Sequence, residues 1–343
     1  MPLSKPLPTF SHMPWNVQKD IVNFTDPLTK LSLFDCLKNC RYLVGSFKPH
    51  FDFIELELDV GRRSISVEFL LPGETKLERK TEFFACPDGF SKQTTHGSRQ
   101  SPKNMIKSKD QNYIDAAVSE LCNLIRGSSV TVKTLKIHTV TPYGDAFRYE
   151  SMKRSVLRKL QSFLGSLPHR LTVFNFHMAF NGIQEDILQV LPYIKPGTLE
   201  CLIIQQIASP ILREAPYEKL NLSKVCELEQ WKRTQKLCLR HFDVKLPVEK
   251  WSQIPESEVH FNELSLATLK KVIQLFSVSE ACRSTTLFSL WFDRETFEQY
   301  FTKLERIPSD DRTNQWKVPI RDSTDYIRIT LTIRSRIKVE RQC

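Results

Sequence analysis

Apolar and polar positions follow two different periods along this chain. Residues 13–44 carry apolar side chains three or four positions apart, which predicts two short amphipathic helices. Residues 51–71 instead alternate apolar and polar positions on both sides of a Gly61-Arg62-Arg63 turn, which predicts a β-hairpin. The alternating apolar residues are Ile54, Leu56, Leu58, Ile65, Val67 and Phe69. Thr81 to Ala85, between two turn signals, predicts a further strand.

Beyond residue 111 a unit recurs in which an amphipathic helix, a short break and an apolar strand follow one another. The predicted strands begin at residues 135, 171, 199 and 237, and a fifth unit starts at Ser265, a predicted helix N-cap, and leads into a strand over 287–292. Each unit leaves an apolar helix face that only its neighbours can cover, so the units are expected to stack. The uneven spacing favours a degenerate leucine-rich-repeat-like array, with Val259 to Phe261 as an extra strand. An ordinary α/β sheet is the alternative.

The last segment, 326–339, alternates again. Its apolar side chains are Ile327, Ile329, Leu331, Ile333, Ile337 and Val339, and its basic side chains are Arg328, Arg334, Arg336 and Lys338. Such a strand has one buried and one basic face. The basic face is either simply solvated or a recognition surface for an acidic protein or RNA.

These patterns divide the chain into five parts. We expect a tail over 1–12, a helical module over 13–48, a β-hairpin or meander over 49–88, a flexible basic loop over 89–110 and an α/β repeat domain over 111–343. The loop is predicted because 89–110 is poor in large apolar residues and rich in Ser, Thr, Gln and Lys.

The helical module is the segment whose residues suggest a function as well as a fold. Pro14 stands in the first turn of its first helix, where proline is tolerated, and Val17 and Ile21 continue an apolar stripe. Its second stripe includes Leu31, Leu33 and Leu37. About thirty residues cannot enclose so many apolar groups alone, so the module must pack on the rest of the chain or on a partner.

Two resemblances add to this reading. Met13-Pro14 and the following apolar positions resemble an F-box, which implies docking on the Skp-type adaptor of a cullin ubiquitin ligase. The stretches 191–200 (LPYIKPGTLE), 228–237 (LEQWKRTQKL) and 261–269 (FNELSLATL) resemble the FTH domain, which usually follows an F-box in the nematode F-box A family. The implied adaptor-binding residues are Met13, Pro14, Val17, Ile21, Leu31, Leu33 and Leu37. Trp251 to Pro255 departs from the FTH pattern, and the 89–110 insert is long.

Composition narrows the choice of partners. Hydrophobic residues make up 41% and charged residues 26% of the 343 residues, as in a soluble globular protein. No apolar run is as long as a signal peptide or a membrane span requires. The net charge of +10 comes from 49 basic residues dispersed among 39 acidic ones, so nucleic acid is the weaker expectation. Nine cysteines without a Cys-x-x-Cys pair indicate reduced thiols. We therefore expect a cytoplasmic or nuclear protein.

No motif in the sequence carries an enzyme's chemistry. Ser166 lacks the second glycine of a nucleophile elbow, and no phosphate-binding loop or His-Glu-x-x-His arrangement is present. Cys36 and Cys40 share a helix face but lack further metal donors nearby. Trp231 and Trp251 are expected in the core. We expect no catalytic residue, metal or cofactor, although a site assembled from distant residues stays open.

The resulting hypothesis is a non-catalytic substrate-recognition subunit of an SCF-type ligase. The helical module would bind a Skp-type adaptor and through it a cullin, and the α/β body would capture an unidentified protein target on one face or the concave edge of its strands. The alternative is a repeat scaffold or RNA-associated protein whose first helices only cap the array.

Overall fold

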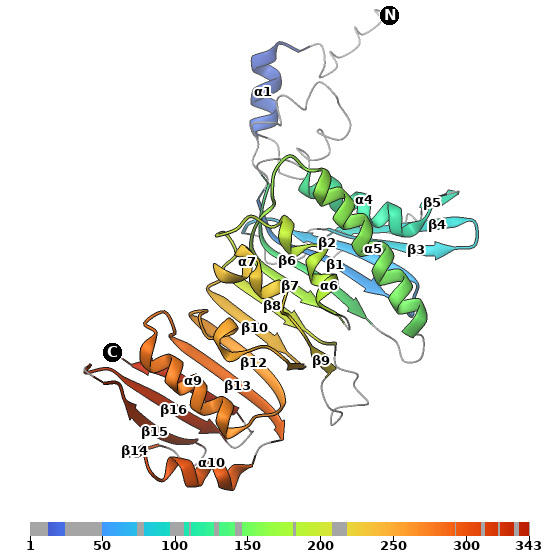
Figure 1. The fold of residues 1–343 in the computed structure, drawn as a ribbon. Helices are drawn as coiled ribbons and strands as arrows, with labels where there is room; N and C mark the ends of the chain where they lie inside the picture. Colours follow the sequence, from blue (N-terminus) through green and yellow to red (C-terminus); the bar gives the residue numbers. More distant parts are fainter. Residues whose placement is uncertain are drawn as a thin grey trace, which may run out of the picture.

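The computed structural model describes most of the chain. The described residues are 13–24, 50–73, 79–96, 106–109, 111–126, 130–140, 146–180, 183–207, 218–291, 293–309, 313–321, 323–332 and 336–342. They form eight α-helices and one large mixed sheet of fifteen strands, with a separate pair of short strands (Figure 1).

Seven parallel strands make the centre of the large sheet. Each new strand adds beside the previous one in chain order, so the sheet grows in one direction. They are β1 (His50–Asp59), β6 (Thr131–Val140), β7 (Thr172–Ala179), β8 (Cys201–Gln205), β10 (Lys236–Arg240), β12 (Glu256–Glu263) and β13 (Ser284–Trp291). Most of these strands are joined by helical crossovers, as parallel neighbours require.

Antiparallel strands extend the sheet at both ends. On the β1 side lie β2 (Ser64–Leu70), β3 (Arg79–Cys86), β4 (Gly89–His96) and β5 (Ile106–Lys109), each paired with the one before. On the β13 side lie β17 (Arg336–Gln342), β16 (Tyr326–Thr332), β15 (Thr313–Pro319) and β14 (Glu305–Ile307). The chain thus forms one large mixed α/β sheet, and the leucine-rich-repeat-like array expected from the sequence is not confirmed.

All described helices except α1 (Trp15–Phe24) lie against one face of the large sheet (Figure 1). They are α4 (Tyr113–Ile125), α5 (Ala146–Ser166), α6 (Gln184–Leu188), α7 (Glu229–Lys232), α8 (Val248–Trp251), α9 (Leu266–Val278) and α10 (Arg294–Phe301), with 3-10 turns η3 (Leu191–Tyr193) and η4 (Val225–Glu227). Three of them start at side-chain caps: Asn112, Ser265 and Asp293 each accept a hydrogen bond from a first-turn backbone N–H. The short strands β9 (Glu218–Leu220) and β11 (Phe242–Val244) pair beside the sheet.

One row of side chains shows how the core runs through the sheet. The register aligns Phe69, Ile54, Leu135, Phe176, Leu202, Leu237, Ser257, Thr285, Val339, Ile329 and Trp316 across eleven strands, and each of these residues is buried. Trp316 stacks on Phe301 of α10 with ring centroids 4.2 Å apart, so α10 lies on this face as well. The core is a continuous layer between sheet and helices.

Several sequence predictions are confirmed. The hairpin of β1 and β2, the strand β3, the extra strand β12 and the cap at Ser265 are all present. Trp231 and Trp251 are buried, and the alternation over 326–339 places Ile327, Ile329, Leu331, Ile337 and Val339 in the core. Ile333 and Arg334 lie outside the described residues.

The predicted flexible loop over 89–110 is wrong where the structure describes it. Residues 89–96 and 106–109 form β4 and β5, and Phe90 packs against Phe83 with ring centroids 5.8 Å apart. These strands lie at the edge of the sheet, where polar residues are usual, so their composition resembles that of a loop. Gly89 has φ +144°, and a Cβ there would collide with the carbonyl oxygen of Ser108.

One predicted boundary also differs. The hairpin region is not a separate connector, because β1 pairs directly with β6 and continues the sheet of the body. The helical segment before β10 consists of η4 and α7, which Leu228 separates in an extended conformation. Among the described residues, no helix is both long and apolar enough to cross a membrane.

Candidate functional site

Charged side chains gather on the face of the sheet opposite the helices. In β6, β7 and β8, fully buried residues that face the helices alternate with residues on the opposite face that are mostly partly exposed. We call the second set the open face, because no described helix covers it (Figure 1). The charged and ring-bearing members that the argument uses are Glu55, Glu57, Glu68, Lys80, Lys136, His138, His177, Arg240, Glu258, His260, Phe288, Lys317, Tyr326, Arg328, Arg336, Lys338 and Glu340.

The end of the open face formed by β1 to β3 and β6 is mainly acidic. Lys136 Nζ lies 2.5 Å from Glu55 Oε1, and Lys80 Nζ lies 2.6 Å from Glu68 Oε1. His138 Nδ1 lies 3.8 Å from carboxylate oxygens of both Glu55 and Glu57. The nearby His138 side chain lowers the pKa of Glu57 against the opposing effect of burial.

Glu55, Glu57 and His138 also have the donor types of a metal site. Their ligand atoms lie within 4.8 Å of one another. Lys136, however, already places its ammonium group against Glu55, so a cation faces this carboxylate without any metal. The cluster is therefore explained as an ion-pair network.

The centre of the open face is a fixed group of polar and aromatic side chains. Arg240 donates two hydrogen bonds to Glu258, at 2.7 Å and 3.1 Å, in the bidentate geometry that arginine favours. A hydrogen bond from His260, together with Arg240, lowers the pKa of Glu258 to about 2. The His260 ring lies 4.6 Å from that of Phe288 and 5.2 Å from that of His241.

His177 lies between the acidic end and this centre. Its side chain is half-buried, and the cationic groups Lys136 and Arg240 lie near it. Burial, followed by the charges of Lys136, His138 and Arg240, lowers the pKa of His177 to about 4. His177 is therefore neutral at physiological pH.

The end formed by β15 to β17 is basic. Glu340 lies 2.6 Å from Lys338 Nζ and 3.7 Å from Arg328 Nη2. The guanidinium of Arg336 lies over the ring of Phe288 at 5.3 Å. The open face thus changes from acidic to basic along the sheet.

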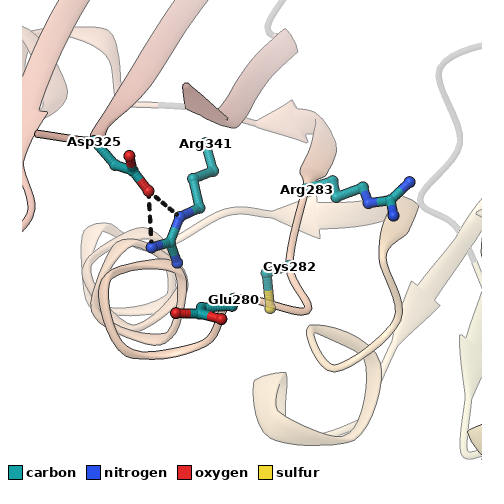
Figure 2. A pocket seen from close by; sticks show the side chains of 5 residues that line it. All are labelled: Glu280, Cys282, Arg283, Asp325 and Arg341. Carbon is teal, nitrogen blue, oxygen red and sulfur yellow. Dashed lines mark hydrogen bonds and ion pairs between the residues drawn. The ribbon is translucent and has the colours of Figure 1, made fainter. Parts of the chain in front are cut away.

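A cavity of about 490 Å³ lies beside the end of β17 (Figure 2). Arg341 donates two hydrogen bonds to Asp325, at 3.2 Å and 3.1 Å, and one to the carbonyl of Ser279. Cys282 is buried, and burial raises the pKa of its thiol, which donates to the carbonyl of Ser252. The thiolate is the nucleophilic form of cysteine, so a buried, protonated Cys282 beside an ion pair that is already formed does not make a nucleophilic site.

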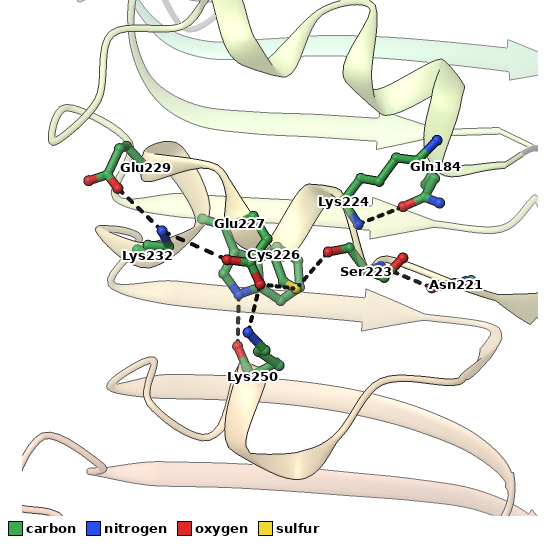
Figure 3. A network of polar contacts seen from close by, with 10 residues as sticks. Gln184, Asn221, Ser223, Lys224, Cys226, Glu227, Glu229, Lys232 and Lys250 are labelled. Atoms are coloured by element: carbon green, nitrogen blue, oxygen red, sulfur yellow. Dashed lines mark hydrogen bonds and ion pairs between the residues drawn. The ribbon is translucent and has the colours of Figure 1, made fainter.

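On the helix side, a polar network joins consecutive units of the body (Figure 3). Lys250 of α8 donates to Glu227 of η4 at 2.6 Å, and Trp231 Nε1 donates to the carbonyl of Lys250 at 2.8 Å. Gln184 of α6 accepts from the backbone N–H of Lys224 at 2.9 Å. These contacts fix loops to each other, which makes the network structural.

The helix α1 (Trp15–Phe24) carries the described part of the predicted adaptor surface. Pro14 directly precedes its first residue, whereas the sequence placed it in the first turn. Val17 is 39% exposed, and Met13 and Ile21 are half-buried. The structure also exposes Trp15, at 57%, a residue that the sequence reasoning missed although it directly follows Met13-Pro14. Leu31, Leu33 and Leu37 lie outside the described residues. α1 stands apart from the sheet (Figure 1).

Comparison with known proteins identifies one domain in the chain. Residues 154–304 match the FTH domain, from within α5 to just after α10. This confirms the FTH resemblance for a narrower segment than the expected 111–343. No curated protein and no solved structure matches the chain.

Proposed function

We propose that this chain is a non-catalytic substrate-recognition subunit of an SCF-type ubiquitin ligase. The FTH match over 154–304 carries the proposal, because the FTH domain usually follows an F-box. In this proposal α1 is part of an F-box that binds a Skp-type adaptor and through it a cullin. The protein works in the cytoplasm or the nucleus and contributes no catalytic residue of its own.

Two exposed apolar residues of α1 support the adaptor contact. Trp15 and Val17 both present their side chains to solvent on this ten-residue helix. Exposed tryptophan is enriched among the residues that dominate binding energies in protein interfaces. A helix that only capped the body would place these side chains inside.

The open face supports the target contact. It combines charged groups held by ion pairs with half-buried aromatic rings, a composition suited to a protein partner. A receptor of this kind supplies proximity, because it holds the target near the conjugating enzyme.

Co-purification of the chain with a Skp-type adaptor tests the proposal. We expect wild type to bind and Val17→Asp to bind at least about tenfold more weakly, because a charge would be buried in an apolar contact. Asn16→Asp introduces the same residue at an exposed neighbouring position and should bind like wild type. Lack of adaptor binding by the folded wild-type chain would refute the proposal.

A repeat scaffold or RNA-associated protein is the second candidate. The basic end of the open face is the observation that favours it. RNA binding that weakens steeply with salt, in a chain that does not bind the adaptor, would favour this candidate over the first.

A further inference from the structure

We propose that the basic end of the open face binds an acidic segment of a partner protein. This inference rests on the proposed function, because it specifies which part of the body holds the target and what chemistry the target presents. The basic end is defined by Phe288 of β13 together with Lys317, Arg328, Arg336, Lys338 and Glu340.

Cations outnumber carboxylates at the basic end. In the described parts of β14 to β17, the open face carries the cations Lys317, Arg328, Arg336 and Lys338 against two carboxylates, Glu340 and Glu305, of which Glu305 is paired with Lys317 in the strand register. Glu340 already lies near two of these cations, so positive charge remains. Its arrangement complements a carboxylate-rich segment.

Aromatic neighbours fix the positions of two of these cations on the open face. Arg336 and Lys317 lie over aromatic rings, of Phe288 at 5.3 Å and Tyr326 at 4.7 Å, which hold both cations on the face. Such positioning lowers the entropy lost on binding.

The width of the basic end matches a short peptide. The register places Lys317 of β15 beside Arg328 of β16, and Arg336 of β17 beside Phe288 of β13, so the basic end extends over these four neighbouring strands. Strands lie about 4.8 Å apart, which gives a width of roughly 15 Å. An extended chain of about five residues covers that length. A short acidic segment is therefore a sufficient ligand.

Fluorescence anisotropy with the purified full-length chain tests the proposal. The probe is a labelled peptide of about ten residues that alternates Glu and Ser, long enough to cross the strands. We expect saturable binding at about 0.05 M salt that weakens at about 0.5 M. Lys317→Glu/Arg336→Glu should lower the affinity about tenfold or more.

The matched control reverses two charges elsewhere. Arg154 and Arg158 are exposed on α5, on the helix side of the molecule, and Arg154→Glu/Arg158→Glu changes the net charge by the same amount. This control should bind the peptide like wild type. Lys317→Gln/Arg336→Gln, a milder change, should also weaken binding if the reversal variant fails to fold.

Three outcomes would overturn the proposal. They are absence of peptide binding by wild type, equal loss in the test and control variants, and tighter binding of a single-stranded oligouridylate that the test variant alone loses. Adaptor binding through α1 should be unchanged in every body variant. A failed peptide test with intact adaptor binding thus leaves the ligase role standing.

Discussion

At the scale of single residues, neighbouring side chains determine the protonation states of Glu258 and His177 on the open face. Glu258 stays ionised because His260 and Arg240 hydrogen-bond to its carboxylate, and His177 stays neutral because it is partly buried among cations. Both effects oppose protonation in the folded state. The stability of the fold is therefore linked to pH through these groups.

His177 gives the clearest prediction. Its pKa falls from 6.5 to about 4 on folding, so its contribution to stability is fully present above pH 6.5 and is lost as the pH falls towards 4. Screening by solvent at this half-buried site leaves a loss on the order of 2 kcal/mol. His177→Gln should show a smaller fall in the free energy of unfolding between about pH 7 and pH 5, measured by urea titration. An equal fall in both proteins would contradict the assignment.

Lys153 shows how one buried charge joins two helices. It lies on α5, is 3% exposed, and pairs with Asp186 of α6 at 2.7 Å and with Glu150 at 2.9 Å. Burial lowers the pKa of Lys153, but the hydrogen bonds with Asp186 and Glu150 outweigh it and the pKa is raised. The lysine is therefore charged in the folded protein.

Loss of that charge should be costly. Lys153→Met leaves the carboxylate of Asp186 buried without its cation, so we expect the free energy of unfolding to fall by about 3 kcal/mol. Lys159→Met on the same helix removes an exposed pair with Asp115 and should cost about 0.5 kcal/mol. Equal costs in urea denaturation would show that burial of the pair does not matter.

At the scale of elements, consecutive units are joined by side chains that reach backbone groups of a neighbouring unit. Trp231 of α7 is buried and donates to the carbonyl of Lys250 in α8, while Gln230 donates to the carbonyls of Pro192 and Ile194. Short helices of four or five residues are marginal alone, so these contacts must hold them.

Trp231→Ala should therefore destabilise the body strongly. Loss of a buried indole leaves a cavity and an unpaired carbonyl, with an expected cost of about 4 kcal/mol. Trp291 is 65% exposed, and Trp291→Ala should change stability by less than about 0.5 kcal/mol. Thermal unfolding of the two variants makes the comparison, and a small effect at Trp231 would contradict the role of the network.

The elements also show what sequence reasoning could reach. Periodicity identified β1, β2, β12 and α9, because each has one clearly apolar face. It missed β4 and β5, in which few positions are buried and polar residues predominate.

At the scale of the whole molecule, the candidate site depends on long-range register. The basic alternation of 326–339 was visible in the sequence, but Lys317 and Phe288 join it only through strand pairing. Likewise Glu55 and Lys136 meet through the parallel pairing of β1 with β6. Local patterns predict which side of a strand is polar, whereas the order of strands decides which polar groups meet.

The proposed receptor has two separate contact surfaces. α1 binds the adaptor, and the basic end of the open face binds an acidic target. The most direct test immobilises the Skp-type adaptor, adds the full-length chain and measures retention of the labelled Glu-Ser peptide. The account predicts that wild type retains the peptide, that Val17→Asp loses both chain and peptide, and that Lys317→Glu/Arg336→Glu keeps the chain but loses the peptide. Failure of the adaptor to retain the folded wild-type chain would contradict the account.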